Sequence, residues 1–267
     1  MRSTQELFRL DGRVALVTGG AGHLGLAFGE ALAEAGAAVA VVDRDSAACE
    51  ARARVLLERG APAAIGLPAD LADPAAVTRA VGHCVSRLGS LDILVNNAAF
   101  TGASGLAGYA VPFPEQSFEA WDAALRVNLS APFLLAQAAR EPLSASGHGC
   151  IVNVSSIYGR VGPHMSLYEG TAMGNPAAYG ASKAGLEQLT RYLATVLAPA
   201  VRVNGIAPGG IERGQAESFR RRYEALTPLQ RMGCEEDFKG ALLYLVSDAS
   251  AYVTGQILGV DGGFTAW

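Results

Sequence analysis

Tyr179 and Lys183 lie four positions apart in the sequence Tyr-Gly-Ala-Ser-Lys, a spacing that can support proton transfer. Residues i and i+4 share one face of a helix, so the two side chains would be neighbours. A free tyrosine hydroxyl has a pKa of about 10, and an adjacent ammonium lowers such a pKa by roughly 1–3 units. We therefore predict that Tyr179 is a general acid/base. A partly buried tyrosine beside a surface lysine would show the same spacing, so this prediction depends on the rest of the chain.

The sequence around this pair predicts the helix that would carry it. Asn175 is a suitable N-cap, and Pro176 suits the first turn. Pro199 limits the far end. Between them, apolar residues recur at helical spacing: Leu186, Leu189, Leu193 and Val196.

A glycine-rich turn near the N-terminus predicts a dinucleotide site. A buried strand over 13–18 precedes the turn, a helix to about Ala35 follows it, and a second strand over 38–42 ends at Asp43. The glycines are Gly19, Gly20, Gly22 and Gly25. They allow close approach of a pyrophosphate to the helix N-terminus, and the carboxylate can accept from ribose hydroxyls. A turn that merely packs helix on sheet is the alternative.

Strand and helix patterns then alternate to the end of the chain. Expected helices cover 46–59, 74–87 and 117–140, and expected strands cover 63–67, 91–95, 150–154 and 200–206. Polar or glycine residues follow each strand, where open α/β sheets bind ligands. We predict an α/β fold with a doubly wound parallel sheet, helices on both faces and one domain over 1–267.

Composition excludes several classes of function. The net charge of -4 gives nucleic-acid binding no electrostatic support. No apolar run is long enough to span a membrane, and the first ten residues lack the apolar run of a signal peptide. Four scattered cysteines without a C-x-x-C motif indicate a reduced, cytoplasmic protein, and no His/Cys cluster has metal-ligand spacing.

Taken in order, these motifs resemble the short-chain dehydrogenase/reductase family over nearly the whole chain. The similarity rests on Thr18–Gly19 with Gly25, Asp70, Asn96–Asn97–Ala98, Asn128, Ser156, Tyr179 with Lys183, Pro208–Gly209 and Asp261–Gly262–Gly263. It implies a single Rossmann-type domain that binds a nicotinamide dinucleotide.

The resemblance implies four catalytic positions. Tyr179 would exchange a proton with the substrate oxygen, and Ser156 would hold that oxygen. Lys183 would lower the pKa of Tyr179 and bind the nicotinamide ribose, and Asn128 would hold a water linking Lys183 to solvent. Ser155 could replace Ser156, and Asn128 could be a structural polar residue.

It also implies the cofactor-binding positions. Besides Tyr179 and Lys183, these are Gly19, Gly22, His23, Leu24, Gly25, Asp43, Arg44, Asp70, Leu71, Asn97, Ala98, Ala99, Pro208, Gly209 and Ile211. His23 stands where the family has glycine and is a tolerated turn residue or a phosphate contact. The threonine that often follows Pro-Gly in the family is missing here. Asp43 favours NAD over NADP, although the adjacent Arg44 weakens this preference.

Ser156 and Tyr179 are 23 positions apart, nearly twice the family's usual gap. We expect the 157–175 insert and the 209–233 segment to form the substrate pocket. The candidate substrate-binding residues are Ser156, Tyr158, Tyr168, Glu169, Tyr179 and Arg213. For Arg220, Arg221 and Arg222 a solvated helix face is the favoured interpretation. The insert is similar to that of dehydrogenases from bacterial surface-glycan and flagellin-modification pathways, which implies a sugar-like substrate.

The predicted function is NAD(H)-dependent interconversion of a secondary alcohol and a ketone on a sugar, polyol or sugar derivative. A 3-oxoacyl-thioester reductase is the alternative enzyme, and a non-catalytic nucleotide-sensing regulator is the alternative of another class. The partner is a small molecule, without nucleic acid or membrane. The family resemblance implies a homotetramer or homodimer.

Overall fold

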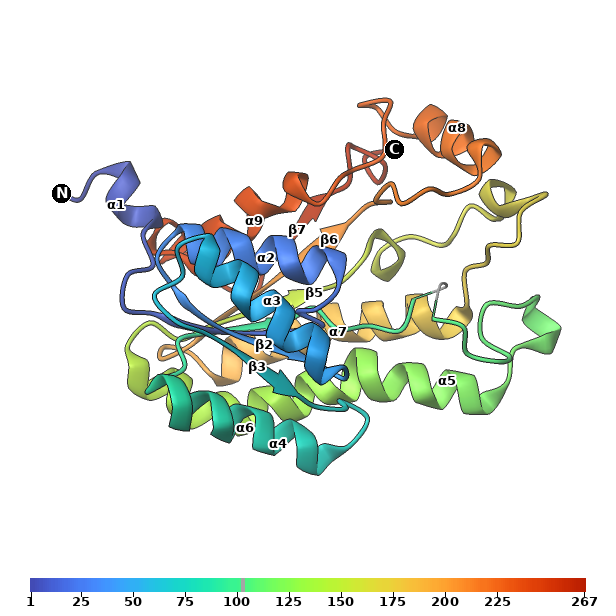
Figure 1. The fold of residues 1–267 in the computed structure, drawn as a ribbon. Helices are drawn as coiled ribbons and strands as arrows, with labels where there is room; N and C mark the ends of the chain where they lie inside the picture. The colour runs from blue at the N-terminus through green and yellow to red at the C-terminus, as the bar shows by residue number, and fades with distance from the viewer. Residues whose placement is uncertain (102–103) are drawn as a thin grey trace.

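The computed structural model describes residues 1–101 and 104–267 and has a parallel β-sheet at its centre (Figure 1). Within these residues the sheet has seven strands in the order β3-β2-β1-β4-β5-β6-β7. The strands are β1 (Val14–Thr18), β2 (Ala38–Asp43), β3 (Ala64–Pro68), β4 (Ile93–Asn96), β5 (Cys150–Val154), β6 (Arg202–Pro208) and β7 (Ile257–Val260). The order reverses between β1 and β4, which is the switch point of a doubly wound sheet. The predicted fold class is therefore confirmed.

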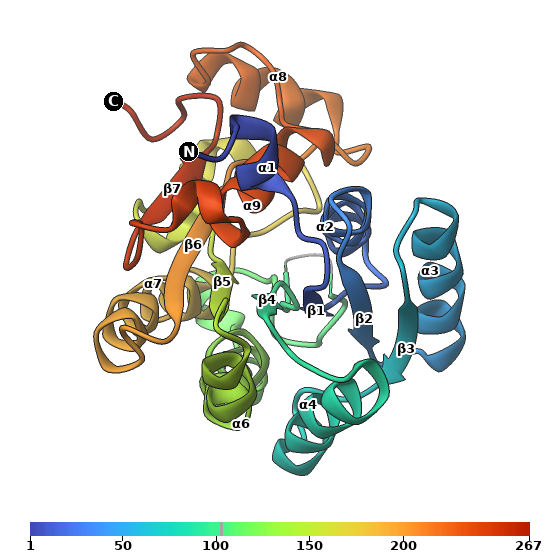
Figure 2. The ribbon, with the colours of Figure 1, turned by 90° about the vertical axis from the view of Figure 1, so that its left-hand side faces the viewer.

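Helices cover both faces of the sheet (Figure 2). One face carries α2 (His23–Glu34), α3 (Ser46–Glu58) and α9 (Glu236–Val246). The other carries α4 (Pro74–Leu88), α6 (Ala131–Ser146) and α7 (Ala177–Val196). The inner strands are largely apolar because they are buried on both sides, whereas the edge strands β3 and β7 are partly exposed. In β1, for example, Val14 and Leu16 enter one core and Ala15 and Val17 the other.

The remaining helices lie at the ends of the molecule. α1 (Thr4–Phe8) is near the N-terminus, and α5 (Phe118–Leu125) and α8 (Glu217–Leu226) lie at the opposite end with the 157–175 segment (Figure 1). Short 3-10 turns are η1 (Phe113–Glu115), η3 (Ile157–Gly159), η4 (Met165–Tyr168) and η5 (Asp248–Ser250). The substrate-side segments thus meet beyond the carboxyl ends of the strands.

The expected helix over 117–140 is not continuous. It consists of α5, a π-helical turn η2 (Arg126–Ser130), and α6, which extends to Ser146. Ser117 caps α5 by accepting from the Ala120 amide at 3.1 Å. π-turns inside helices occur often at functional sites, and this one contains the buried Asn128.

The cap of α7 also differs from the prediction. Pro176 is its N-cap, whereas the Asn175 side chain donates to the Tyr168 hydroxyl at 3.2 Å. Because Asn175 is used in this tertiary contact, it is not available to the helix. The strand β7 and the helix α9 were not predicted from the sequence.

Candidate active site

Tyr179, Ser156 and Lys183 meet at the carboxyl end of the sheet. Tyr179 lies in the first turn of α7, and Lys183 lies one turn further on. Ser156 is the second residue after β5, and its Oγ accepts from the Tyr158 amide at 3.2 Å, which caps η3. The Ser156 hydroxyl also acts to lower the pKa of Tyr179 by favouring the phenolate, although burial outweighs this effect. The two hydroxyls can therefore contact one substrate oxygen.

Lys183 is buried, with 2% of its surface exposed, and its Nζ donates to the Val154 carbonyl at 2.6 Å. Burial lowers the pKa of Lys183 to about 8. Burial also raises the pKa of Tyr179, and this outweighs the opposite effects of Ser156 and Arg213. The expected lowering of the Tyr179 pKa is therefore not observed. Spacing along a helix could not show how deeply both groups are buried.

Ser155 points toward α7. Its Oγ donates to Glu187 Oε1 at 3.1 Å and lies 3.3 Å from the Lys183 carbonyl oxygen. These contacts direct the Ser155 hydroxyl to Glu187 and Lys183, further along α7 than Tyr179. Of the two serines, it is Ser156 that acts on Tyr179.

Asn128 is fully buried in the π-turn. Its Oδ1 accepts from the Phe100 amide at 2.7 Å, and its Nδ2 donates to Ser182 Oγ at 3.0 Å and to the Phe100 carbonyl at 3.2 Å. Ser182 Oγ in turn donates to the Tyr179 carbonyl at 2.8 Å. The side chain thus links the segment after β4 to the start of α7. The whole amide is used in these contacts.

The glycine turn has the shape that a pyrophosphate site needs. Gly19 has a φ of +61°, and a Cβ on Gly25 would lie 2.1 Å from the Gly19 carbonyl oxygen. Gly22 is the N-cap of α2, so the exposed His23 is the first residue of that helix. Leu24 packs against the core formed by α2, α3 and α9. The turn therefore fits a dinucleotide at the free N–H groups of α2.

Asp43 lies against this turn. One carboxylate oxygen accepts from the Ala21 amide at 3.2 Å, and the other accepts from the Arg44 amide at 2.8 Å. Arg52 on α3 donates from Nε to the Ala21 carbonyl at 3.3 Å, which brings a guanidinium to the same turn. Sequence reasoning missed Arg52, because it lies nine positions beyond Asp43, within α3.

The other expected cofactor residues lie around the same edge. Asn97 donates from Nδ2 to the carbonyls of Thr18 at 2.9 Å and Gly19 at 3.1 Å, which holds the glycine turn in place. Asp70 is exposed, whereas the Leu71 side chain is buried in the core. Ala98 and Ala99 follow β4, and Pro208, Gly209 and Ile211 follow or end β6.

A hydroxyl-rich wall faces Tyr179 from the 157–175 insert. The hydroxyls of Tyr158 and Tyr168 are 2.9 Å apart, and Asn175 Nδ2 donates to the second of them. Burial raises the pKa of Tyr158, so this hydroxyl stays protonated. The Tyr168 ring packs on Phe219 of α8 with centroids 5.4 Å apart. The insert and the 209–233 segment therefore form one unit.

Most of the arginines in the 209–233 segment are engaged. Arg220 and Arg221 pair with Glu217 on α8, and Arg222 donates to the carbonyls of Ser166 at 3.0 Å and Glu169 at 2.7 Å. Arg222 is thus a clamp on the insert, and the interpretation of a solvated face is wrong for it. The exposed Glu169 meets α8 through its backbone.

Arg213 differs from these arginines. It contacts Glu235 at 3.1 Å through Nε, and its positive charge lowers the pKa of Tyr179. Among the described residues its two terminal nitrogens have no hydrogen-bond partner. These nitrogens can therefore meet a ligand group.

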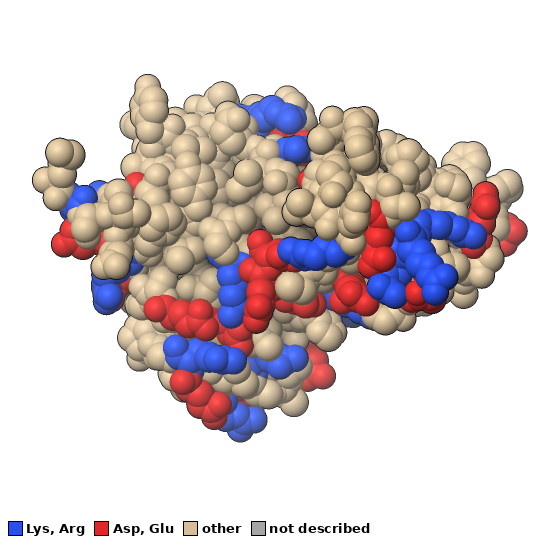
Figure 3. All heavy atoms as spheres, turned by 90° about the horizontal axis from the view of Figure 1, so that it is seen from above, with Lys and Arg blue, Asp and Glu red and all other residues tan. Residues whose placement is uncertain are grey.

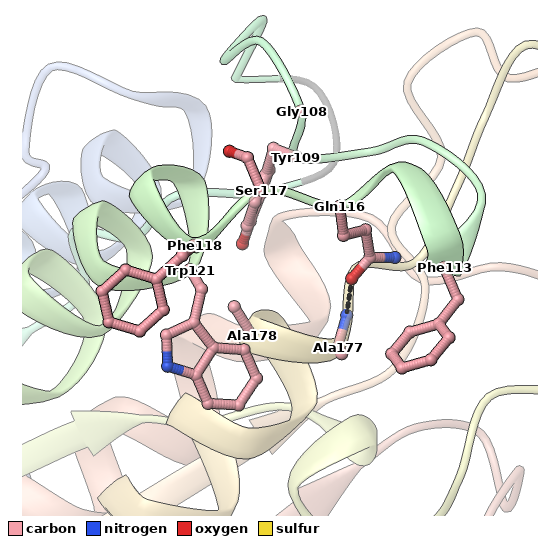
Figure 4. Close-up of a pocket in the computed structure, with 9 residues that line it drawn as sticks. All are labelled: Gly108, Tyr109, Phe113, Gln116, Ser117, Phe118, Trp121, Ala177 and Ala178. Atoms are coloured by element: carbon pink, nitrogen blue, oxygen red, sulfur yellow. Dashed lines mark hydrogen bonds between the residues drawn. The ribbon is translucent and has the colours of Figure 1, made fainter.

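A separate pocket of about 280 Å³ lies behind the start of α7 (Figure 4). Its walls are mainly the aromatic side chains of Tyr109, Phe113, Phe118 and Trp121, and Gln116 accepts there from the Ala177 amide at 3.0 Å. Tyr109 and Trp121 also pack around Tyr179. The pocket thus supports the tyrosine's helix and does not include its hydroxyl.

Charge and metal-ligand patterns add no second kind of site. On the face seen in Figure 3, acidic and basic side chains are interspersed over a largely uncharged surface. In the part of the chain that the structure describes, no three His, Cys, Asp or Glu side chains are grouped as metal ligands. None of the helices in residues 1–101 and 104–267 combines the length and apolarity needed to cross a membrane.

Comparison with known proteins places the chain among enzymes. A family model described as enoyl-(acyl carrier protein) reductase matches residues 19–265. The chain is 37% identical to a cis-4-hydroxycyclohexanecarboxylate dehydrogenase of Sinomonas cyclohexanicum, over 95% of this chain and 97% of the relative. It is also 37% identical to a D-threitol dehydrogenase of Mycolicibacterium smegmatis, over 99% of both chains.

A solved structure agrees over the full length. The gluconate 5-dehydrogenase of Burkholderia cenocepacia, in complex with NADP and tartrate, superposes with a TM-score of 0.88 at 33% identity. The match covers 99% of this chain and 100% of that chain. The chain belongs to the short-chain dehydrogenase/reductase family. It is an NAD(P)-dependent oxidoreductase that interconverts a secondary alcohol and a ketone.

Proposed function

We propose that Tyr179 is the proton-transfer residue and that Ser156 holds the reacting oxygen. In alcohol oxidation, Tyr179 Oη takes the proton of the substrate hydroxyl while Ser156 Oγ donates to the oxygen that becomes the carbonyl. In ketone reduction the same tyrosine returns the proton. When bound, the nicotinamide accepts or supplies the hydride at the carbinol carbon. The single observation that carries this proposal is that Ser156, just beyond β5, and Tyr179, in the first turn of α7, come together so that the serine hydroxyl favours the phenolate, while Lys183 of the same helix is tied to the end of β5.

Lys183 and Asn128 support this pair in our proposal. The Lys183 ammonium lies 5.8 Å from the Tyr179 ring centre, and its N–H groups can hold the nicotinamide ribose. Asn128 keeps the start of α7 in place through Ser182. Because its pKa is raised, the partly buried Tyr179 stays protonated and can donate in ketone reduction.

We also propose that the cofactor lies across the glycine turn with NAD preferred. Gly19, Gly22 and Gly25 allow the pyrophosphate to approach α2, and the Asp43 carboxylate accepts from the adenosine ribose hydroxyls. A 2′-phosphate would be repelled by this carboxylate. Arg44 and Arg52 flank it and reduce the repulsion, so the preference is graded.

The proposed substrate is a polyhydroxylated alcohol or hydroxy acid. The hydroxyls of Tyr158 and Tyr168 offer hydrogen-bond partners for substrate hydroxyls, and the terminal nitrogens of Arg213 suit a carboxylate. The relatives named for D-threitol and for cis-4-hydroxycyclohexanecarboxylate represent these two kinds of substrate.

A substrate panel tests this proposal. NADH formation is followed with D-threitol, gluconate and cis-4-hydroxycyclohexanecarboxylate, and NADH consumption with an acetoacetyl thioester. Turnover of a polyol or hydroxy acid at least tenfold above that of the thioester supports the proposal. Preferential turnover of the thioester would instead assign a 3-oxoacyl-thioester reductase.

The proposed assembly is a homotetramer or homodimer in the cytoplasm. Phe133, Tyr192 and Val196 are exposed on α6 and α7, and Leu258 is exposed on the edge strand β7. Apolar side chains on such surfaces favour contact between copies. The described cysteines are all free thiols, which agrees with a reducing compartment. Sedimentation equilibrium measures the subunit number.

A further inference from the structure

Glu187 is a buried carboxylate that the reaction described above does not use. It lies on α7 one helical turn beyond Lys183, and 4% of its side chain is exposed. Its Oε1 accepts from Ser155 Oγ at 3.1 Å and from Arg160 Nε at 3.2 Å, and its Oε2 lies 3.5 Å from Arg191 Nη2. A buried charge is retained at low cost only where it is fully paired.

Two of these partners flank Ser156. Ser155 directly precedes it, and Arg160 follows it by four residues at the end of η3. One carboxylate on α7 therefore holds both sides of the turn that presents the Ser156 hydroxyl. The same helix carries Tyr179.

The packing under this turn is equally close. A Cβ on Gly159 would lie 2.9 Å from Ser155 Oγ and 3.0 Å from the Lys183 carbonyl carbon, so η3 rests directly on the α7 backbone. Arg160 also donates from Nη2 to the Ile257 carbonyl at 2.5 Å, which ties the turn to β7. The turn is thus fixed to a helix and to a strand.

We propose that Glu187 is a positioning residue for the reaction: through Ser155 and Arg160 it sets the distance between the Ser156 and Tyr179 hydroxyls. This inference rests on the function proposed above. Its energetic basis is that a displacement of about 1 Å at a reacting group can lower the rate by as much as 100-fold. Arg191 contacts the same carboxylate from the solvent side and does not touch the Ser156 turn.

The first test compares single variants at 25 °C, well below their melting temperatures. Glu187→Ala should lower kcat by about 10- to 100-fold while the Kd for NADH stays within twofold. Glu187→Gln keeps an acceptor for both partners and should restore most of the loss. Arg191→Gln is the matched control and should leave kcat unchanged. If Glu187→Ala does not fold, Ser155→Ala removes the hydroxyl contact alone and should lower kcat by roughly three- to tenfold.

A double-mutant cycle with Ser156→Ala separates positioning from general stability. If Glu187 acts through Ser156, Glu187→Ala should have no further effect on kcat in the Ser156→Ala background. The inference would be overturned if the kcat losses of Glu187→Ala and Ser156→Ala multiplied in the double variant. It would also be overturned if Glu187→Ala lowered the melting temperature but left kcat within twofold of wild type. If Ser156→Ala alone leaves kcat unchanged, the proposed role of Ser156 in holding the reacting oxygen is wrong. This outcome differs from the two that would overturn the role of Glu187.

Discussion

Lys183 Nζ lies 5.8 Å from the centre of the Tyr179 ring and donates its hydrogen bond to the Val154 carbonyl at the end of β5. The lysine therefore joins the tyrosine's helix to the strand that leads into Ser156. Lys183 is buried and Tyr179 is partly buried in this arrangement, and burial disfavours the charged form of each. Burial lowers the pKa of Lys183 to about 8 and raises that of Tyr179.

The lysine gives a prediction about stability and pH. Its folded-state pKa of about 8 is below the ordinary value of 10.5 for an exposed lysine, so between these values the unfolded chain binds more protons. The free energy of unfolding should therefore increase as pH rises from 8 toward 10, and Lys183 should account for up to about 3 kcal/mol of this increase. Urea unfolding at pH 7.5 and 9.5 measures it.

Lys183→Met should remove this rise. Lys239→Met, which deletes a lysine paired with Glu30 on the far side of the sheet, controls for the loss of one lysine. An identical pH slope in Lys183→Met and wild type would contradict the burial of the ammonium.

Asp43 gives a prediction about the cofactor. Asp43→Ser should lower the ratio of kcat/KM for NAD to that for NADP by about tenfold or more, because the repulsion of a 2′-phosphate is lost. Asp45→Asn, two residues later at the cap of α3, should leave the ratio unchanged. A wild-type protein that uses NADP as well as NAD would refute the proposed preference.

The insert gives a prediction about the substrate. Tyr168→Phe keeps the ring on Phe219 but removes the hydroxyl that Tyr158 and Asn175 share as a hydrogen-bond partner. Leaving such a group buried and unpaired costs about 1–3 kcal/mol. KM for a polyol should rise severalfold while NADH affinity stays constant. Glu169 is the second candidate substrate-binding residue in the insert. We expect Glu169→Ala to change substrate preference and to leave NADH affinity unchanged. Loss of NADH binding in either variant would show a structural role.

Arg213 gives a prediction about charge selectivity. Arg213→Gln should raise KM for cis-4-hydroxycyclohexanecarboxylate by about tenfold or more, as expected for a lost charge-assisted hydrogen bond. KM for the neutral D-threitol should change little. Arg221→Gln, whose partner is Glu217 on the exposed side of α8, is the control. Equal effects on both substrates would exclude a carboxylate contact.

The sequence predicts six of the seven strands and the placement of Tyr179 and Lys183 on one helix because both leave local signals. Buried parallel strands read as apolar runs, and Tyr179 and Lys183 share a helix face at fixed spacing. Strand bounds differ from the prediction by a few residues, as for β6, which begins at Arg202 and reaches Pro208.

Long-range contacts leave no such signal. Arg52 reaches the glycine turn from α3, Arg222 clamps the insert from 53 residues away, and Glu187 meets Ser155 across 32 residues. The π-turn at Asn128 is also invisible in the hydrophobic pattern, which reads through it as one helix. These features depend on how the elements pack, which periodicity does not encode.

The most direct test of the central claim is the turnover of Tyr179→Phe, which deletes the transferable proton and keeps the partly buried ring. Wild type and variant are compared for NADH formation with the best substrate of the panel, and for NADH binding by fluorescence titration. We predict a loss of kcat of about 100-fold or more, as expected for removal of a general acid/base, with the Kd for NADH within twofold. A variant that turns over within threefold of wild type would contradict the assignment of Tyr179.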